Sequence, residues 1–382
     1  MNFEQEVLTI RRHVHKNPEL GGNEYETAKF IESNLKELNI PYKRIGKTGV
    51  IATINTTKRG KTIALRADID ALPICENNDV EYKSTKSGIM HACGHDAHIA
   101  VVLGVAKLLQ SRKNKLKGNV RFIFQPNEET FDGAKVMIEC GALKNPNVNF
   151  ILGIHVYPWL KSGKIGFKFG TMMAAVDKIK VKIIGLVTHG AYPHKGKDAL
   201  VITSIFVNMV QEIISREIDP LEGSVITFGK ITGGDAYNII CKEVTLEGTV
   251  RTFSNEVRHL IRTSILNKIK SLEIAYGVKC TVQYQVISNT LVNNDDIVQQ
   301  CIESAKEFYG NEKVEIMKKP SMGGEDFSEY LDKVPGNFIY IGTSGDKHTS
   351  YPWHHTNFNI DESALPKAAK YIAYTVEKNL NK

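Results

Sequence analysis

The chain has 382 residues, of which 42% are hydrophobic and 24% are charged. These proportions are typical of globular proteins, so they exclude a disordered or a fibrous chain. The formal net charge is +7, but the 49 basic residues are interspersed with 42 acidic ones and accompany no motif that reads nucleic acid. We therefore expect no nucleic-acid partner. The length exceeds what one hydrophobic core usually serves, which favours two or three domains.

The sequence also indicates the cellular location of the protein. No apolar run approaches the ~20 residues that cross a bilayer. The acidic start, Met1 to Glu6, lacks the basic and apolar stretches of a secretion signal. The six cysteines include no CxxC pair, so we expect reduced thiols rather than disulfides. Together these features predict a cytoplasmic protein without a membrane partner.

Helices and strands alternate in the first part of the chain. Phe3, Val7, Ile10 and Val14 recur at helical spacing, and Asn23 is expected to cap a second helix. Further predicted elements are strands at 50–54, 62–67, 120–124 and 151–155 and helices at 96–110 and 133–140. This alternation is typical of βαβ units, so it predicts an α/β fold with a mainly parallel sheet flanked by helices. Chemistry in such sheets gathers at the C-terminal ends of the strands.

The pattern changes near residue 178. The next predicted elements are a strand from 179, a helix at 200–215, strands at 224–232 and 244–250, a helix at 256–276 and a strand at 278–286. This β-α-β-β-α-β order is typical of a ferredoxin-like α+β unit. After residue 295 the earlier pattern returns, with helices at 297–308 and 366–380 and strands at 314–317 and 338–341. We therefore predict an α/β domain, residues 1–177 and 291–382, interrupted by a smaller inserted α+β domain, residues 178–290.

Residues 91–98, with the sequence HACGHDAH, hold three histidines, a cysteine and an aspartate. They lie where a predicted loop gives way to a helix, so we expect these five residues to converge on one cation. Thiolate and imidazole are preferred ligands of zinc-like metals, and a helix N-terminus favours the thiolate form of a cysteine. For any one of these residues, a position in a histidine-rich surface loop is the alternative.

Other candidate residues lie at or just beyond the ends of predicted strands. Glu128 and Glu129 follow strand 120–124, and if one carboxylate binds a cation the other can act as a general base. The remaining candidates are Asp68 and Asp70 after strand 62–67, His155 at the end of strand 151–155, and His354 and His355 before the last helix. Taken singly, each is equally typical of an ordinary core or surface position. Their coincidence at one edge of one sheet predicts a metal site.

The inserted domain has candidates of its own. His189 lies in a glycine- and proline-containing loop, THGAYPH at 188–194, and Asn238 lies in a second loop, GGDAYN at 233–238. Arg251 ends the segment GTVR at 248–251. Such side chains hold carboxylates and oxyanions in many enzymes. Ordinary turn and strand positions explain them equally well.

Taken together, these motifs resemble the metallopeptidase family of aminoacylases and carboxypeptidase-G-type enzymes. Within that family, the chain is similar to the branch of hippurate hydrolases, N-acetyl-diaminopimelate deacetylases and plant indole-acetyl-amino-acid hydrolases. The resemblance spans nearly the whole chain. It rests on RRH at 11–13, PEL at 18–20, RADIDALP at 66–73, MHACGHD at 90–96, FQP at 124–126, GIHV at 153–156, GTVR at 248–251, GEDF at 324–327 and HH at 354–355.

The resemblance implies that the α/β domain is catalytic and binds two divalent metal ions, which are zinc, manganese, cobalt or nickel. The implied ligands are Cys93, His95, Glu129, His155 and His354. His354 is preferred to His355 because the family's ligand stands six residues before the isoleucine at position 360. Glu128 would be the general base and acid, and Asp70 would lie behind the site and orient a ligand.

The resemblance also implies a role for the inserted domain, which would be a lid through which the protein forms a homodimer. His189 would reach from this lid into the site of the other subunit and stabilise the tetrahedral oxyanion. Asn238 and Arg251 would help to hold the carboxylate of the substrate.

The implied activity is that of a metal-dependent amidohydrolase, which cleaves the amide bond of an N-acyl (acetyl, benzoyl or similar) amino acid. A dipeptidase or carboxypeptidase with the same dinuclear site is the alternative, since a peptide bond is also the amide of an N-acyl amino acid. A non-catalytic metal-binding relative is a further alternative, which the intact glutamate pair disfavours. A thiol redox enzyme is the least favoured, because Cys93 has no neighbouring resolving cysteine.

Overall fold

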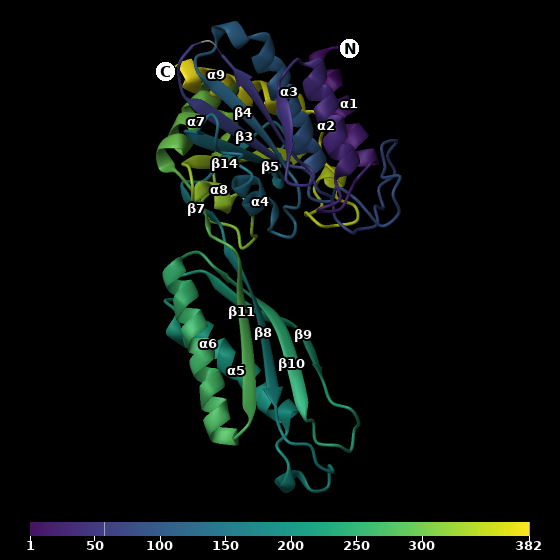
Figure 1. Cartoon of the computed structure of the whole chain (residues 1–382), viewed down its shortest axis with the longest axis vertical. Coiled ribbons are helices and arrows are strands. Elements are labelled where there is room, and N and C mark those ends of the chain that lie inside the picture. Colours follow the sequence, from purple (N-terminus) through teal and green to yellow (C-terminus); the bar gives the residue numbers. More distant parts are fainter. Residues whose placement is uncertain (57, 382) are drawn as a thin grey trace. The chain divides into compact units, whose positions relative to one another are not determined.

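The computed structural model describes residues 1–56 and 58–381; residues 57 and 382, which the predicted catalytic domain includes, lie outside that description. The chain forms two compact units (Figure 1). Unit 1 comprises Met1–Met172, Val292–Lys319 and Asp326–Lys382, and unit 2 comprises Met173–Leu291 and Pro320–Glu325. That these units are a catalytic domain and a lid stays a prediction.

An eight-stranded sheet with the order β1-β2-β4-β3-β5-β14-β6-β13 forms the centre of unit 1. β3 pairs in parallel with β4 and β5, and β5 pairs in parallel with β14. Every residue of β3 is buried, as expected for a strand that is covered on both faces. The strands are β1 (Tyr42–Ile45), β2 (Gly49–Asn55), β3 (Thr62–Asp68), β4 (Asn119–Gln125), β5 (Phe150–Lys161), β6 (Ile165–Phe167), β13 (Val314–Ile316) and β14 (Gly336–Ser344). Two further short strands, β7 (Gly170–Met173) and β12 (Leu291–Asn293), pair with each other.

Helices cover this sheet. They are α1 (Phe3–Lys16), α2 (Tyr25–Glu37), α3 (His95–Ser111), α4 (Gly133–Glu139), α7 (Asp295–Tyr309), α8 (Ser328–Leu331) and α9 (Ala364–Asn381). α3 packs against α1, α9 and the central strands. It is buried without interruption from His95 to Ala106, because nearly all of its side chains after the first turn are apolar. This burial holds the first turn of α3, with His95, rigidly beside the strand ends.

The start of α2 differs from the prediction. The helix begins at Tyr25 after Glu24 and has no side-chain cap at that position, so Asn23 as its cap was wrong. Instead, the carboxylate of Glu19 accepts hydrogen bonds from the main-chain N–H of Thr27 at 2.8 Å and from its hydroxyl at 2.9 Å. A side chain from the preceding turn thus satisfies one of the free N–H groups in the first turn of the helix.

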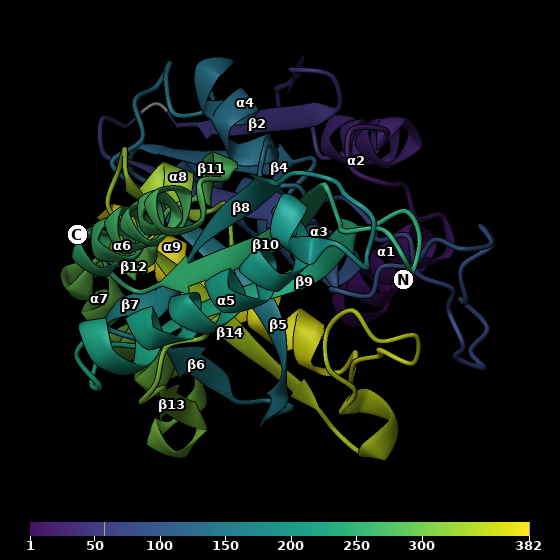
Figure 2. The same ribbon diagram turned by 90° about the horizontal axis from the view of Figure 1, so that it is seen from below.

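Unit 2 contains a four-stranded antiparallel sheet with the order β11-β8-β10-β9. Its elements are β8 (Ala175–Ile184), α5 (Ala199–Glu212), β9 (Ser224–Gly233), β10 (Glu243–Thr252), α6 (Asn255–Tyr276) and β11 (Lys279–Ser288). α5 and α6 lie side by side against the sheet (Figure 2). Ile179, Val181 and Ile183 of β8 are buried and alternate with lysines, as expected for a strand with one covered face.

One helix of unit 2 is long and apolar enough to span a membrane by length and composition. It runs from Ala199 to Glu217, where α5 continues into a short π-helix. It is the exception to our expectation that no apolar run approaches this length. Ile202, Phe206 and Val210 of this helix are buried in the hydrophobic core of unit 2, so packing against the small sheet explains its composition.

The predicted fold class is confirmed: a mainly parallel sheet is flanked by helices, and the inserted segment has the predicted β-α-β-β-α-β order. The margins of the large sheet differ from the prediction. β5 continues to Lys161 because it goes on pairing with β14 beyond His155. β1 was not predicted, since Tyr42 and Lys43 are exposed and offer no apolar pattern. β2 lies antiparallel to both of its neighbours.

Candidate metal centre

Cys93 and His95 lie on either side of a sharp turn at the start of α3. Gly94, between them, has a φ of 91°, a left-handed conformation that residues with a Cβ rarely adopt. A Cβ at this position would lie 2.3 Å from Cγ2 of Val156. A glycine therefore lets this turn approach β5 closely, which brings Cys93 to His155.

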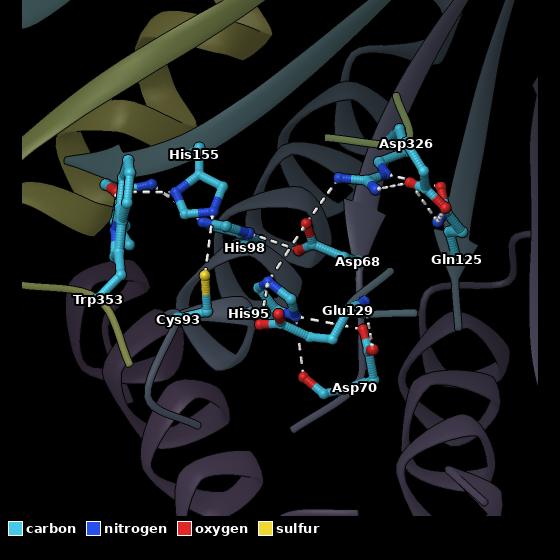
Figure 3. Close-up of polar contacts among 12 residues, drawn as sticks. Asp68, Asp70, Cys93, His95, His98, Gln125, Glu129, His155, Asp326 and Trp353 are labelled. Carbon is cyan, nitrogen blue, oxygen red and sulfur yellow. Dashed lines mark hydrogen bonds and ion pairs between the residues drawn. The ribbon is translucent and has the colours of Figure 1, made fainter. Parts of the chain in front are cut away.

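The five predicted metal ligands come together at the ends of the central strands. Figure 3 shows four of them, Cys93, His95, Glu129 and His155. Sγ of Cys93 lies 3.5 Å from Nε2 of His155. Cys93, His95 and Glu129 each place one ligand atom within 4.8 Å of the others. Nε2 of His354 lies 3.5 Å from Oε2 of Glu129. Segments far apart in the sequence thus supply one sulfur, three imidazoles and one carboxylate to a single region.

Hydrogen bonds hold two of the imidazoles in a form that suits a metal ligand. Nδ1 of His95 donates to the main-chain oxygen of Asp70 at 2.9 Å, and Nδ1 of His155 donates to the main-chain oxygen of Val156 at 2.8 Å. In each neutral ring the lone pair is then on Nε2, which faces the centre. Burial lowers the pKa of His155 well below its ordinary value, so this ring is neutral at physiological pH.

The charges at the centre favour a cation. Nε2 of His95 is buried and has no hydrogen-bond partner among the described residues; it lies 3.6 Å from Oδ2 of Asp68 and 3.9 Å from Oε1 of Glu129. Burial opposes protonation of His95, but the charge of Asp68 and the hydrogen bond and charge of Asp70 outweigh it and raise the pKa of His95 to about 10. These carboxylates thus stabilise a positive charge between them, and a divalent metal ion supplies one. The donor set of sulfur, nitrogen and oxygen also suits the predicted metals.

Glu128 and Glu129 lie on the segment 126–133, between β4 and α4, which we call the glutamate loop. The main-chain N–H of Glu129 donates to Oδ2 of Asp70 at 3.0 Å. Burial raises the pKa of Glu129 to about 7, so its ionised form needs a nearby positive charge. Glu128 is 6% exposed, and one of its carboxylate oxygens lies within 4.8 Å of one from Asp326.

The two adjacent histidines near the C-terminus differ in their surroundings. His354 has a φ of 63° and donates its main-chain N–H to the oxygen of Ala92 at 2.9 Å, which turns its ring towards Glu129. His355 stacks on Tyr351, and its Nδ1 accepts a hydrogen bond from the main-chain N–H of Asn357. This geometry supports His354, rather than His355, as the ligand.

Only part of the segment 91–98 reaches the centre. Oδ2 of Asp96 lies 2.7 Å from Nε of Arg11 and 2.7 Å from Nδ1 of His15, so its charge is neutralised on the far side of the turn. His91 is buried but belongs to none of the groups that could hold a metal among the described residues. The expectation that the whole segment converges on a cation is therefore too broad.

Two metal-site candidates of the sequence, His98 and Asp68, bind each other and support the centre. Nδ1 of His98 donates to Oδ1 of Asp68 at 2.5 Å, and its Nε2 accepts the main-chain N–H of Val156 at 3.0 Å. Both ring nitrogens of His98 are thus occupied, which makes it a support for the centre although its atoms lie near His95 and His155. The signal in the sequence was the arginine and aspartate at 66 and 68 within a strand that is otherwise apolar, since buried charges need partners.

Two of the predicted lid residues, His189 and Asn238, lie together in unit 2. Their loops pair through the bridge between His189 and Ile239 and through a hydrogen bond from the N–H of Gly190 to the oxygen of Asn238 at 2.7 Å. Nδ1 of His189 accepts the main-chain N–H of Ala191 at 3.1 Å, so in the neutral ring Nε2 carries the proton and can donate it to a ligand.

Arg251 lies elsewhere in the same unit. It is near the end of β10, and one of its nitrogens donates to the main-chain oxygen of Met322 at 2.9 Å. The loop of Asn238 precedes the opposite end of this strand, at Glu243. At ~3.3 Å per residue, Arg251 is separated from Glu243 by roughly 26 Å along the strand. Within one copy of unit 2, Arg251 therefore does not meet His189 and Asn238.

Comparisons with known proteins agree with this geometry. Residues 64–378 match the model of peptidase family M20/M25/M40. The chain is 41% identical to an N-acetyl-L-cysteine deacetylase of Bacillus subtilis over 99% of this chain and 89% of that protein. It is 34% identical to a hippurate hydrolase of Campylobacter jejuni, covering 100% of this chain and 98% of the other.

A solved structure gives the same result. A dinuclear metal-binding peptidase of the M20 family from Bacillus subtilis superposes with a TM-score of 0.87 and 34% identity, over 99% of each chain. These findings confirm the resemblance that the sequence motifs indicated. The chain belongs to peptidase family M20/M25/M40.

Proposed function

We propose that this chain is a metal-dependent amidohydrolase that splits N-acyl amino acids, with acetyl, benzoyl or similar acyl groups, into a carboxylate and a free amino acid. The observation that carries the proposal is the meeting of Cys93, His95, Glu129, His155 and His354, with a second buried glutamate, Glu128, next to Glu129 in the chain. The similarity to an N-acetyl-L-cysteine deacetylase and to a hippurate hydrolase supports this class of substrate.

We infer that these five side chains hold two divalent metal ions, which are zinc, manganese, cobalt or nickel. When bound, such ions lower the pKa of water towards about 7 and polarise an amide carbonyl. The chain contributes the geometry: the main chain of Asp70 and of Val156 fixes the orientation of His95 and His155. Asp70 also holds Glu129 in place through its side chain.

Glu128 is the proposed general base and acid. Its carboxylate would accept a proton from the attacking water while the water oxygen bonds to the amide carbon. The same proton would then pass to the amide nitrogen as the C–N bond breaks, which releases the free amino acid. General acid–base catalysis of this kind typically contributes 10²–10⁴-fold to the rate.

The positions of the lid residues support a homodimer with shared active sites. His189 is proposed to donate a hydrogen bond to the oxyanion, and Asn238 and Arg251 to hold the substrate's carboxylate. The loop of Asn238, which pairs with the loop of His189, precedes Glu243 at one end of β10, and Arg251 lies roughly 26 Å from Glu243 along this strand. One copy of unit 2 is therefore too long to present all three residues to a small substrate. We infer that His189 and Asn238 act in the site of the other subunit.

Peptide hydrolysis is the second candidate, because the structural relative from Bacillus subtilis is described as a peptidase. A dipeptide contains the same grouping of an acylated nitrogen and a free carboxylate. The two candidates differ in what the acyl side of the pocket accepts. All six cysteines lie in the described part of the chain and none of them forms a disulfide, which fits the proposed location in the reducing cytoplasm.

The test is a hydrolysis panel on metal-free protein reloaded with each of the four metals. N-acetyl and N-benzoyl amino acids should be cleaved at least tenfold faster than dipeptides and C-terminal residues of longer peptides. Faster cleavage of dipeptides would favour the second candidate. A protein that binds two metals per chain but hydrolyses none of these substrates would contradict both.

A further inference from the structure

One buried carboxylate holds both ends of the glutamate loop. Oδ2 of Asp326 accepts a hydrogen bond at 2.9 Å from the main-chain N–H of Ala134, just after the loop. Both oxygens of Asp326 also accept from Nε2 of Gln125, just before the loop, at 2.8 Å (Figure 3). Asp326 is fully buried, and it lies in the GEDF segment, to which the proposed reaction assigns no role.

The glutamate loop needs such external support because its backbone is unfavourable by itself. Asn127 and Phe131 have φ values of 58° and 63°, in the left-handed region that residues with side chains seldom adopt. The ends of the loop also approach closely, since a Cβ on Gly133 would lie 1.8 Å from the main-chain oxygen of Pro126. Glu128 and Glu129 therefore occupy a turn whose shape depends on residues outside it.

Arg66 neutralises Asp326 and links it to the metal centre. Its guanidinium is fully buried and lies 2.8 Å from Oδ1 of Asp326 and 2.6 Å from Oδ2 of Asp68. Nε of Arg66 also donates to Oε1 of Gln125 at 2.9 Å. Asp68 in turn accepts a hydrogen bond from His98 and lies 3.6 Å from Nε2 of His95. One arginine thus joins the support of the glutamate loop to the support of a predicted metal ligand.

We propose that the ion pair between Arg66 and Asp326 is a positioning device for Glu128. The pair holds the two ends of the glutamate loop at a fixed distance, so that Glu128 keeps its place in the loop next to the predicted ligand Glu129. The positive charge of Arg66 also offsets the repulsion between the carboxylates of Asp326 and Glu128, which approach within 4.8 Å. Both residues of the pair act through Glu128, so the inference rests on the proposed function.

The test compares Asp326→Asn, Glu128→Gln and the double variant in the full-length, metal-loaded protein. Asp326→Asn should lower kcat about 10- to 100-fold, while KM and the number of metals bound per chain stay unchanged. The double variant should lose no more activity than Glu128→Gln alone, because residues that act as a unit are not additive. A normal kcat in Asp326→Asn, or losses that simply multiply, would overturn the inference.

The matched control is Arg121→Lys. Arg121 lies on β4 and is buried, as Asp326 is, but it donates to the main-chain oxygens of Lys144 and Asn145. Replacing its guanidinium should therefore lower the melting temperature and leave kcat unchanged. If Asp326→Asn does not fold, Gln125→Leu, which keeps the ion pair, must show the same non-additivity with Glu128→Gln. A wild-type protein that hydrolyses no N-acyl amino acid would refute the proposed function itself, and full turnover by Glu128→Gln would remove Glu128 as the base. An inactive Glu128→Gln beside a normal Asp326→Asn would refute only this inference.

Discussion

Asp70 contacts both Glu129 and the neighbouring ligand His95. Its Oδ2 accepts the main-chain N–H of Glu129 at 3.0 Å, and its main-chain oxygen accepts Nδ1 of His95 at 2.9 Å. Asp70, which follows β3 in the chain, therefore sets the positions of two predicted metal ligands that come from different segments. Such supports are typically needed for both metal affinity and turnover.

Asp70→Asn is expected to weaken metal binding or activity about 10- to 100-fold, because it removes the charge behind His95 and Glu129. Metal affinity is measured by competition with a chelator, and turnover with an N-acetyl amino acid. The control is Asp79→Asn, which changes an exposed aspartate. Wild-type affinity and turnover in Asp70→Asn would show that the charge is dispensable.

Glu128→Gln should retain bound metal and substrate but turn over about 10²–10⁴-fold more slowly, because the amide cannot accept the proton of the attacking water. Single-turnover kinetics and metal analysis on the same preparation measure both properties. Glu139→Gln, at an exposed position of α4, is the matched control. Near-normal turnover by Glu128→Gln would remove Glu128 as the base.

Cys93→Ala should reduce the number of metals bound per chain, because the variant lacks the sulfur that lies 3.5 Å from Nε2 of His155. Elemental analysis after dialysis measures the metal content. Cys140→Ala, at an exposed cysteine, should bind metal as the wild type does. If Cys93→Ala also binds the full amount of metal, the thiol has a structural role only.

His189→Ala should lower kcat and leave metal content intact, since loss of one oxyanion donor typically costs ~3–4 kcal/mol. Mixing it with Glu128→Gln tests the shared site. Random exchange of subunits puts one intact site in each mixed dimer, so roughly a quarter of wild-type activity should return. A mixture that stays as inactive as its components would indicate that His189 acts within its own subunit.

His15 is expected to make stability depend on pH. Burial and the charge of Arg11 oppose its protonation, but Asp96, 2.7 Å from Nδ1, and Glu76, 3.1 Å from Nε2, prevail and raise its pKa above 6.5. A group whose pKa is higher in the folded than in the unfolded state contributes its full stabilisation at a pH below the pKa of the unfolded state. This contribution is lost as the pH rises through the pKa of the folded state.

The measurement is urea unfolding of the wild type and His15→Asn across a range of pH. The variant's deficit in unfolding free energy should be largest below about pH 6.5 and should shrink at higher pH. His348→Asn, at an exposed histidine, should show no such trend. A deficit that grows with pH would mean that His15 is neutral in the folded protein.

Much of the fold could be predicted because it depends on local patterns. The apolar stretch of 62–67 and the alternation of Ile179, Val181 and Ile183 predict two strands, and the structure contains β3 and β8 at these positions. The margins of the sheet could not be predicted in this way. β1 has two exposed residues of four and is held by pairing with β2, which a local pattern does not reveal.

The amino-acid sequence alone was sufficient to predict the family, the two-part architecture and the side chains that could bind metal or act in catalysis. Periodicity and short motifs are properties of neighbouring residues, so they can be recognised without the fold. It did not show which members of a motif share a site. His95 faces the centre, whereas Asp96, the next residue, binds Arg11 and His15, and His98 binds Asp68. Arg66 reaches Asp326 across 260 positions of the chain. The packing of distant segments determines which partner each buried charge has, so these pairings exist only in the folded protein.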